Sequence, residues 1–250
     1  MNPMKRLPVS LLALLLLSVP LAHGQATGKT SPDDPWAGAF GAGFSLTGGN
    51  TSTTSLNISF NALRDAKTGN VIKLNGLYLR IDQKQEKTAD RLRLSGRDEW
   101  TVSDRMFVFG GATYQRDPFK EIIYLLNPQG GLGYKLVNSE KVLLSFGGGA
   151  GMSWEKNPGF DVNTSGTVNA SQDLEFHLAE GTLIYQNASG FWKMDNFRYS
   201  IYHFTAGLDT QITGHIRLKV EFADDYTNLT PSPEVLKNDT AFLTTFLYSF

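Results

Sequence analysis

From position 36 onward, hydrophobic and polar residues alternate along the chain in segments of about 10 to 16 residues. The clearest segment lies near position 91, where Leu92, Leu94 and Trp100 share one face. The opposite face carries Arg91, Arg93, Arg97 and Glu99. Side chains of a strand point alternately to its two faces, so the pattern predicts a strand with one apolar and one charged face.

Three further segments repeat this pattern. Ile216, Leu218, Val220 and Phe222 alternate with Arg217, Lys219 and Glu221. Positions 142–154 and 56–61 alternate in the same way with smaller or polar neighbours. If the apolar faces meet lipid, the charged residues line the interior of a barrel, and their mixed signs predict ion pairs there. The predicted lumen-lining set is Arg91, Arg93, Arg97, Glu99, Arg217, Lys219 and Glu221.

The whole pattern predicts an all-β fold, an antiparallel up-and-down transmembrane β-barrel of the bacterial outer-membrane type. We expect about twelve strands, beginning near positions 36, 51, 70, 89, 105, 121, 140, 161, 181, 195, 215 and 239. An even number places both termini on one side. Between Phe197 and Leu208 aromatic residues occur on both registers, so a β-bulge there remains an open alternative.

Turn lengths provide a second test, because bacterial barrels pair short periplasmic turns with longer outer loops. With a periplasmic N-terminus, the inner turns fall at 102–105, 137–140, 178–181 and 210–214, and all are short. The outer connections at 82–88, 116–121, 156–160 and 228–238 are mostly longer. A short outer turn at 47–50 and a longer inner one at 64–70 break this rule.

Aromatic residues favour the two membrane interfaces, and they recur near both predicted rims. The inner set is Trp36, Trp100, Phe107, Tyr248 and Phe250, and the outer set is Tyr114, Trp154, Phe160, Trp192 and Tyr226. The alternative is a secreted soluble β-sandwich that acts as a binding module, whose strands would be shorter. The ending Phe246, Tyr248, Phe250 favours the barrel, because it resembles the signal that barrel-assembly machinery recognises in a last strand.

The first segment predicts export. Lys5 and Arg6 precede an apolar run from Leu7 to Leu21 that is shorter than the roughly 20 residues of a spanning helix. Small residues follow, so we expect a cleaved signal peptide over 1–26, a flexible leader over 27–35 and the barrel domain over 36–250. The expected location is the bacterial outer membrane.

Composition changes this picture little. The net charge is -1 and the charges are interspersed, which gives no nucleic-acid footprint. The chain has no cysteine, which excludes disulfides, thiolate metal sites and thiol nucleophiles. We expect no cofactor and no metal, although calcium binding by Asp224, Asp225 and Asp239 at the outer rim stays open.

From Trp36 to Phe250 the sequence resembles domain-of-unknown-function family 481, whose members are described as salt-induced outer-membrane proteins. Three stretches carry the resemblance, at 44–54 (FSLTGGNTSTT), at 130–155 (GGLGYKLVNSEKVLLSFGGGAGMSWE) and at 208–222 (LDTQITGHIRLKVEF), followed by the LYSF ending. The resemblance implies a barrel in the outer membrane. It implies no catalytic residues.

Catalytic groups are scarce. His177 and His215 border predicted inner turns, and His203 lies within a strand without a His-x-Ser pair. Asp224 and Asp225 are adjacent, so they point to opposite faces, and we interpret them as charges at a loop end. The glycines at 147–151 lack the Lys-Thr ending of a phosphate loop, and we interpret them as allowing close packing in a barrel wall.

Three functions therefore remain. The first is a non-enzymatic envelope protein, either a narrow channel for small solutes or ions with a weak anion preference or a stress-related protein. The second is an outer-leaflet lipid hydrolase with His203 as base, and the third is the soluble binding module. The expected partners are outer-membrane lipid and the barrel-assembly machinery, and the sequence does not set the oligomeric state.

Overall fold

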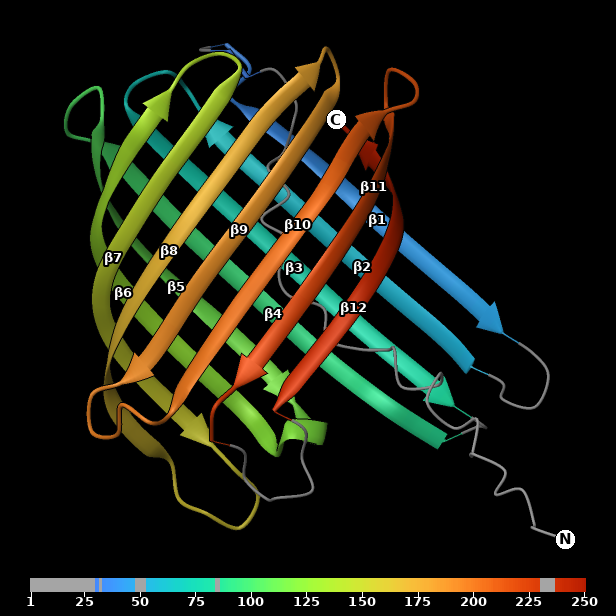
Figure 1. Cartoon of the computed structure of the whole chain (residues 1–250), viewed down its shortest axis with the longest axis vertical. Helices are drawn as coiled ribbons and strands as arrows, with labels where there is room; N and C mark the ends of the chain where they lie inside the picture. Colours follow the sequence, from blue (N-terminus) through green and yellow to red (C-terminus); the bar gives the residue numbers. More distant parts are fainter. Residues whose placement is uncertain (1–29, 32, 48–52, 84–85, 230–236) are drawn as a thin grey trace, which may run out of the picture.

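The structure is a computed structural model that describes residues 30–31, 33–47, 53–83, 86–229 and 237–250. In this part of the chain twelve antiparallel strands form a closed barrel in which each strand pairs with its sequence neighbours and β1 pairs with β12 (Figure 1). The predicted all-β barrel and its strand number are confirmed. Among the described residues, no helix is long and apolar enough to cross a membrane.

The twelve strands are long, as a tilted crossing of a membrane requires. They are β1 (Trp36–Thr47), β2 (Thr53–Asp65), β3 (Asn70–Gln83), β4 (Glu86–Thr101), β5 (Met106–Asp117), β6 (Ile122–Asn138), β7 (Val142–Lys156), β8 (Asn163–Ala179), β9 (Thr182–Lys193), β10 (Ser200–Gln211), β11 (Ile216–Thr227) and β12 (Asn238–Ser249). One short 3-10 helix, η1 (Pro118–Lys120), lies between β5 and β6.

Both chain ends of the barrel domain lie at one rim, which we call the inner rim. The connections at this rim are 66–69, 102–105, 139–141, 180–181 and 212–215. The described connections at the opposite, outer rim include 157–162 and 194–199, which are longer. The described outer connection 118–121 has only four residues, so the asymmetry of short and long turns holds in part. The inner turn expected at 64–70 shrinks to four residues because both flanking strands extend further.

Exposure alternates along the strands as the sequence pattern predicts. On β11, Ile216 and Phe222 are exposed and Arg217 and Glu221 are buried. On β10 the pairing with both neighbours is continuous from Ile201 to Thr210, so no bulge lies within that strand. The aromatic residues on two registers arise because Phe197 and Tyr199 belong to the loop before β10.

The inner aromatic set needs one correction. Phe107 points into the barrel with 6% of its surface exposed, and a Cβ at Gly133 would collide with its ring. Phe109 shares this inward face, where the Arg97 guanidinium lies 3.7 Å from its ring centroid. The assignment of Phe107 to the lipid-facing belt is wrong. Near the inner rim, the inward face of β5 carries the large side chains of Phe107 and Phe109.

Glycines let the backbones of β6 and β7 approach closely. Gly131 pairs with Gly149, and a Cβ on either would collide with a backbone carbonyl of the opposite strand. At Gly148, by contrast, a Cβ would make only an ordinary contact of 3.9 Å with the Asn169 carbonyl. The glycine-rich segment at 147–151 therefore belongs to a tightly packed wall of the barrel.

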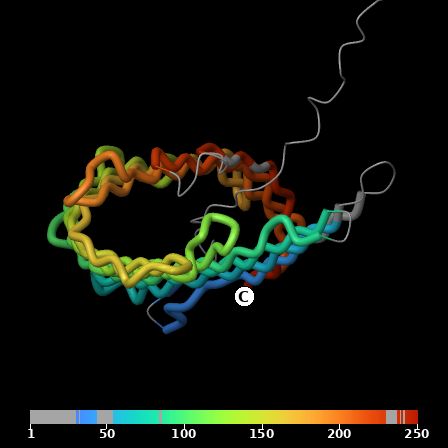
Figure 2. Tube along the Cα trace, turned by 90° about the horizontal axis from the view of Figure 1, so that it is seen from below, coloured from blue at the N-terminus to red at the C-terminus, as the bar shows by residue number. Residues whose placement is uncertain are grey.

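Seen along its axis, the barrel has a flattened, oval section (Figure 2). Strands β4 and β10 are six strands apart in either direction around the ring, so they face each other across the interior. The short dimension of the oval lets side chains from opposite walls meet.

Candidate functional site

The predicted lumen-lining residues all lie on inward faces of two strands. Arg91, Arg93, Arg97 and Glu99 alternate along β4, and Arg217, Lys219 and Glu221 alternate along β11. On β11 each of the three is nearly inaccessible to solvent. A strand buried on one face and lipid-facing on the other places every second residue in the interior.

Most of these charges form ion pairs with interior residues of the same or a neighbouring strand. Arg97 Nε lies 2.8 Å from Glu99, and the other carboxylate oxygen of Glu99 lies 2.9 Å from Lys73 Nζ. Lys219 Nζ lies 2.9 Å from Glu221, and Arg217 Nε donates to Asp209 at 2.8 Å. Pairing of this kind offsets the cost of removing charges from water.

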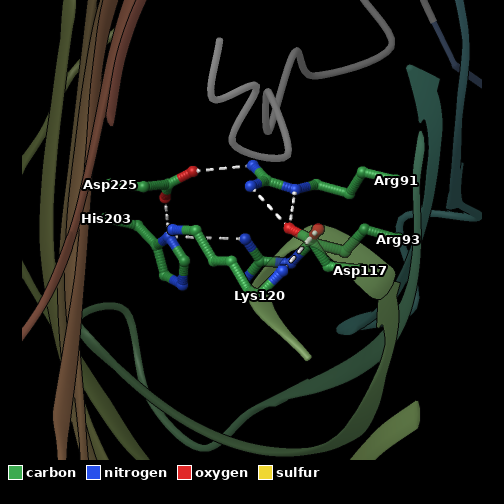
Figure 3. Close-up of polar contacts among 6 residues, drawn as sticks. All are labelled: Arg91, Arg93, Asp117, Lys120, His203 and Asp225. Atoms are coloured by element: carbon green, nitrogen blue, oxygen red, sulfur yellow. Dashed lines mark hydrogen bonds and ion pairs between the residues drawn. The ribbon is translucent and has the colours of Figure 1, made fainter. Parts of the chain in front are cut away.

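One cluster joins opposite walls of the barrel (Figure 3). Arg91 Nε on β4 donates to Asp117 Oδ2 on β5 at 2.7 Å, and Arg91 Nη1 reaches Asp225 Oδ2 on β11 at 3.2 Å. The second oxygen of Asp225 contacts His203 Nδ1 on β10. Arg93 Nη1 lies 3.5 Å from the same ring nitrogen. We call Arg91, Arg93, Asp117, His203 and Asp225 the cross-barrel cluster.

Asp117 also organises the loop above the cluster. Its Oδ1 accepts a hydrogen bond from the backbone N–H of Lys120 at 3.3 Å, which caps the first turn of η1. Pro118 at the start of this short helix has no N–H to satisfy, so the turn forms readily. The cluster is thereby fixed to a turn of the outer rim, and the Lys120 side chain lines the same region.

Two cavities meet at the cross-barrel cluster. An outer vestibule of about 570 Å³ opens toward the outer rim, and an inner cavity of about 200 Å³ extends toward the inner rim. Both are lined by Arg93, Gln115, Ile201 and His203, so these four residues form the junction between them. Polar and charged side chains line the interior on both sides of this junction, together with apolar ones.

A second buried ion pair lines the outer vestibule. Lys193 Nζ on β9 lies 2.6 Å from Glu155 Oε2 on β7, and Tyr199 donates to Glu155 Oε1 at 3.1 Å. The Lys193 ammonium also lies 4.0 Å from the centroid of the Tyr199 ring. This pair stabilises the wall of the vestibule and holds the loop before β10 against it.

The sequence pattern missed several members of these clusters. Asp225 was interpreted as a charge at a loop end, which is wrong, because it lies within β11 with 3% of its surface exposed. The sequence does contain a sign of this position. Asp225 follows Glu221 and Ala223 at intervals of two residues, and residues two apart on a strand point to the same face, here the inward one. Asp224 lies on the outward register, opposite Phe204.

None of the histidines forms a catalytic constellation with the described residues. His177 is exposed at the inner end of β8, and His215 Nδ1 lies 3.2 Å from the Ser249 carbonyl at the inner rim. His203 contacts Asp225, as a base would contact an orienting carboxylate, but no hydroxyl of the described residues hydrogen-bonds to it. The pair also faces the interior, away from outer-leaflet lipid.

Metal binding finds no support in the described part of the chain. No group of three histidine or acidic residues there is arranged to hold a metal ion. Asp225 is engaged by Arg91 and His203, and the Asp239 side chain lies outside the described residues, as do the predicted signal peptide at 1–26 and most of the leader at 27–35.

Comparisons with known proteins agree with the fold. Residues 40–250 match the family described as "Protein of unknown function, DUF481". No curated protein matches the sequence. An outer-membrane channel from Pseudomonas putida F1 is 12% identical, with 100% of both chains covered and a TM-score of 0.53.

Two further solved structures have lower TM-scores. The NanC porin is 14% identical over 85% of this chain and 97% of that one, with a TM-score of 0.46. The translocator domain of the autotransporter NalP from Neisseria meningitidis is 11% identical over 86% of each chain, with a TM-score of 0.47. At these identities the likeness concerns the fold alone.

Proposed function

The chain belongs to the DUF481 family, and we propose that it forms a narrow, non-enzymatic passage for small solutes or ions across the bacterial outer membrane. The observation that carries this proposal is the meeting of the outer vestibule and the inner cavity at four residues inside a closed barrel. Barrels of about this size enclose a narrow lumen whose side chains decide what passes.

Charge at the junction favours anions weakly. The junction carries one arginine and one histidine beside a neutral amide and an isoleucine. Elsewhere in the interior, cations are largely neutralised by ion pairs, so the remaining field is small. A narrow site with a low-dielectric wall concentrates such a field on a passing ion.

Export and assembly belong to the same proposal. A cleaved signal peptide over 1–26 would deliver the chain across the inner membrane. The assembly machinery would then recognise the last strand through Phe246, Tyr248 and Phe250, whose side chains are exposed on the outer surface of the barrel. Outer-membrane lipid would surround that surface.

Planar-bilayer recording of the purified, refolded chain tests the passage. We expect small conductance steps and, in a salt gradient, a reversal potential shifted toward the anion. His203→Ala removes the imidazole from the junction and is expected to increase the step size. His215→Ala, at the exposed inner rim, serves as the matched control and should conduct as the unmodified chain does.

One result would contradict the passage, and another would contradict the position of its narrowest point. One is a folded barrel that gives no conductance steps, which would leave a stress-related envelope role. The other is a conductance that His203→Ala does not change, which would place the narrowest point elsewhere.

A further inference from the structure

In the described part of the chain, Arg93 differs from the other interior arginines in having no carboxylate at ion-pair distance. No carboxylate oxygen among the described residues lies within 4.0 Å of its guanidinium nitrogens, whereas Arg91, Arg97 and Arg217 each form such a pair. Its Nε is buried and makes no hydrogen bond with the part of the chain that the structure describes. The guanidinium lies at the floor of the outer vestibule.

With the described residues, Arg93 makes one hydrogen-bond contact, to a nitrogen that another group already contacts. Arg93 Nη1 lies 3.5 Å from His203 Nδ1, and the Asp225 carboxylate contacts the same nitrogen. A ring nitrogen either carries a proton and donates or lacks one and accepts. The carboxylate only accepts, so Nδ1 carries the proton, and Arg93 is left without an acceptor.

The oxygens of the neighbouring carboxylates are already engaged by other groups, and none of them lies within ion-pair distance of Arg93. Asp225 Oδ2 accepts from Arg91, and Oδ1 contacts His203. Asp117 Oδ2 accepts from Arg91, and Oδ1 accepts from the Lys120 backbone. A largely buried guanidinium that makes no direct contact with a carboxylate is costly. A bound anionic ligand would supply the direct contact that no carboxylate of the described residues makes with Arg93.

The vestibule limits what this ligand can be. Its volume of about 570 Å³ suits a small organic molecule, and its lining includes the hydrogen-bonding side chains of Asn157, Asn163 and Thr227. The guanidinium fork matches the geometry of a carboxylate. Because the Asp225 charge lies close by, a monoanion meets less repulsion than a phosphate dianion does.

We propose that Arg93 binds the carboxylate group of a small, hydroxylated organic acid that enters the outer vestibule. This inference rests on the proposed passage only for the route that the acid takes onward. Binding itself requires the vestibule and the Arg93 guanidinium.

Calorimetric titration of the full chain in detergent micelles tests the site, with gluconate as the probe. Gluconate is expected to bind saturably, and glucose, which is similar in size but neutral, is expected not to bind. Arg93→Gln should weaken gluconate binding about tenfold or more, because it removes a charge-assisted hydrogen-bond pair. Arg97→Gln is the matched control on the same strand and should leave gluconate affinity unchanged, since Arg97 is paired with Glu99.

Each alternative result is decisive. Equal gluconate affinity of Arg93→Gln and the unmodified chain, or an equal loss in Arg97→Gln, overturns the site. Phosphate binding as tightly as gluconate overturns the carboxylate assignment. If Arg93→Gln fails to fold, Arg93→Lys keeps the charge, and unchanged gluconate affinity in that variant contradicts a role for the guanidinium fork.

The outcomes for the site and for the passage are separable. Conductance without saturable gluconate binding removes the site and leaves the passage. Saturable gluconate binding in a barrel that does not conduct leaves the site and removes the passage.

Discussion

Asp225 connects three strands through one carboxylate. Its two oxygens contact Arg91 on β4 and His203 on β10, while Asp225 itself lies on β11. The side chain is 4% exposed, so water competes little for these contacts. Removal of the charge takes one carboxylate partner from Arg91 and a hydrogen-bond acceptor from His203.

Asp225→Asn is expected to lower the free energy of unfolding by about 3 kcal/mol, because the buried cluster of Arg91 and Arg93 then loses one of its two carboxylates. Urea titration of the refolded chain in lipid vesicles, followed by tryptophan fluorescence, measures this change. Asp82→Asn is the control, since Asp82 pairs with the half-exposed Arg80, and such a surface pair contributes little. Equal unfolding midpoints for both variants would show that the cross-barrel cluster does not hold the walls together.

The last strand closes the barrel along a short seam. β12 pairs with β11 over eleven residue pairs but with β1 over only four, from Ala39–Ser249 to Ala42–Phe246. Gly38 and Phe250 add two backbone hydrogen bonds at the inner end, of 3.1 and 3.0 Å. The Phe250 ring lies over Gly38 and stacks on Phe40 at 5.8 Å between centroids.

Phe250→Ala removes this stacking from the shortest seam, so we expect a loss of about 1 kcal/mol in unfolding free energy. If Phe250 is also part of the assembly signal, less of the variant protein should reach the outer membrane in cells. Fractionation measures this amount, and the heat-dependent gel mobility measures how much of the protein is a folded barrel. Phe242→Ala is the matched control, because Phe242 on β12 is similarly exposed but has no partner in β1. Unchanged folding and outer-membrane level in Phe250→Ala would refute both roles of this residue.

Strand positions were predictable because alternation is a local property of the sequence. Expected starts at 36, 70, 105, 121 and 181 fall within one residue of the observed ones. The largest shift is at β10, which begins at Ser200 instead of near 195 because the loop before it contains aromatic residues of its own. Phe107 was misassigned for a related reason, since an aromatic side chain on a strand does not by itself indicate which face meets lipid.

At the scale of the whole molecule, the contacts of the cross-barrel cluster join residues that are far apart in the sequence. Arg91 and Asp225 are 134 residues apart in the sequence, and Arg93 and His203 are 110 apart. The alternation predicts that these side chains face inward. It does not indicate that the barrel is flattened so that β4 meets β10 and β11 across the interior (Figure 2).

The outer surface carries aromatic residues at both rims. The chain has four tryptophans, and each lies near a strand end: Trp36 and Trp100 at the inner rim, Trp154 and Trp192 at the outer rim. Trp192 Nε1 donates to the Tyr202 hydroxyl at 3.1 Å on this surface. Amphipathic rings at two levels are expected where a wall crosses a bilayer.

Fluorescence quenching in vesicles of brominated lipid tests this crossing most directly, because every tryptophan reports from a rim. We expect strong quenching of the refolded chain by lipids with bromine near the headgroup and weak quenching by lipids with bromine near the end of the acyl chain. Stronger quenching by the deeply brominated lipid, or no quenching by either, would contradict a barrel that spans the membrane between two aromatic belts.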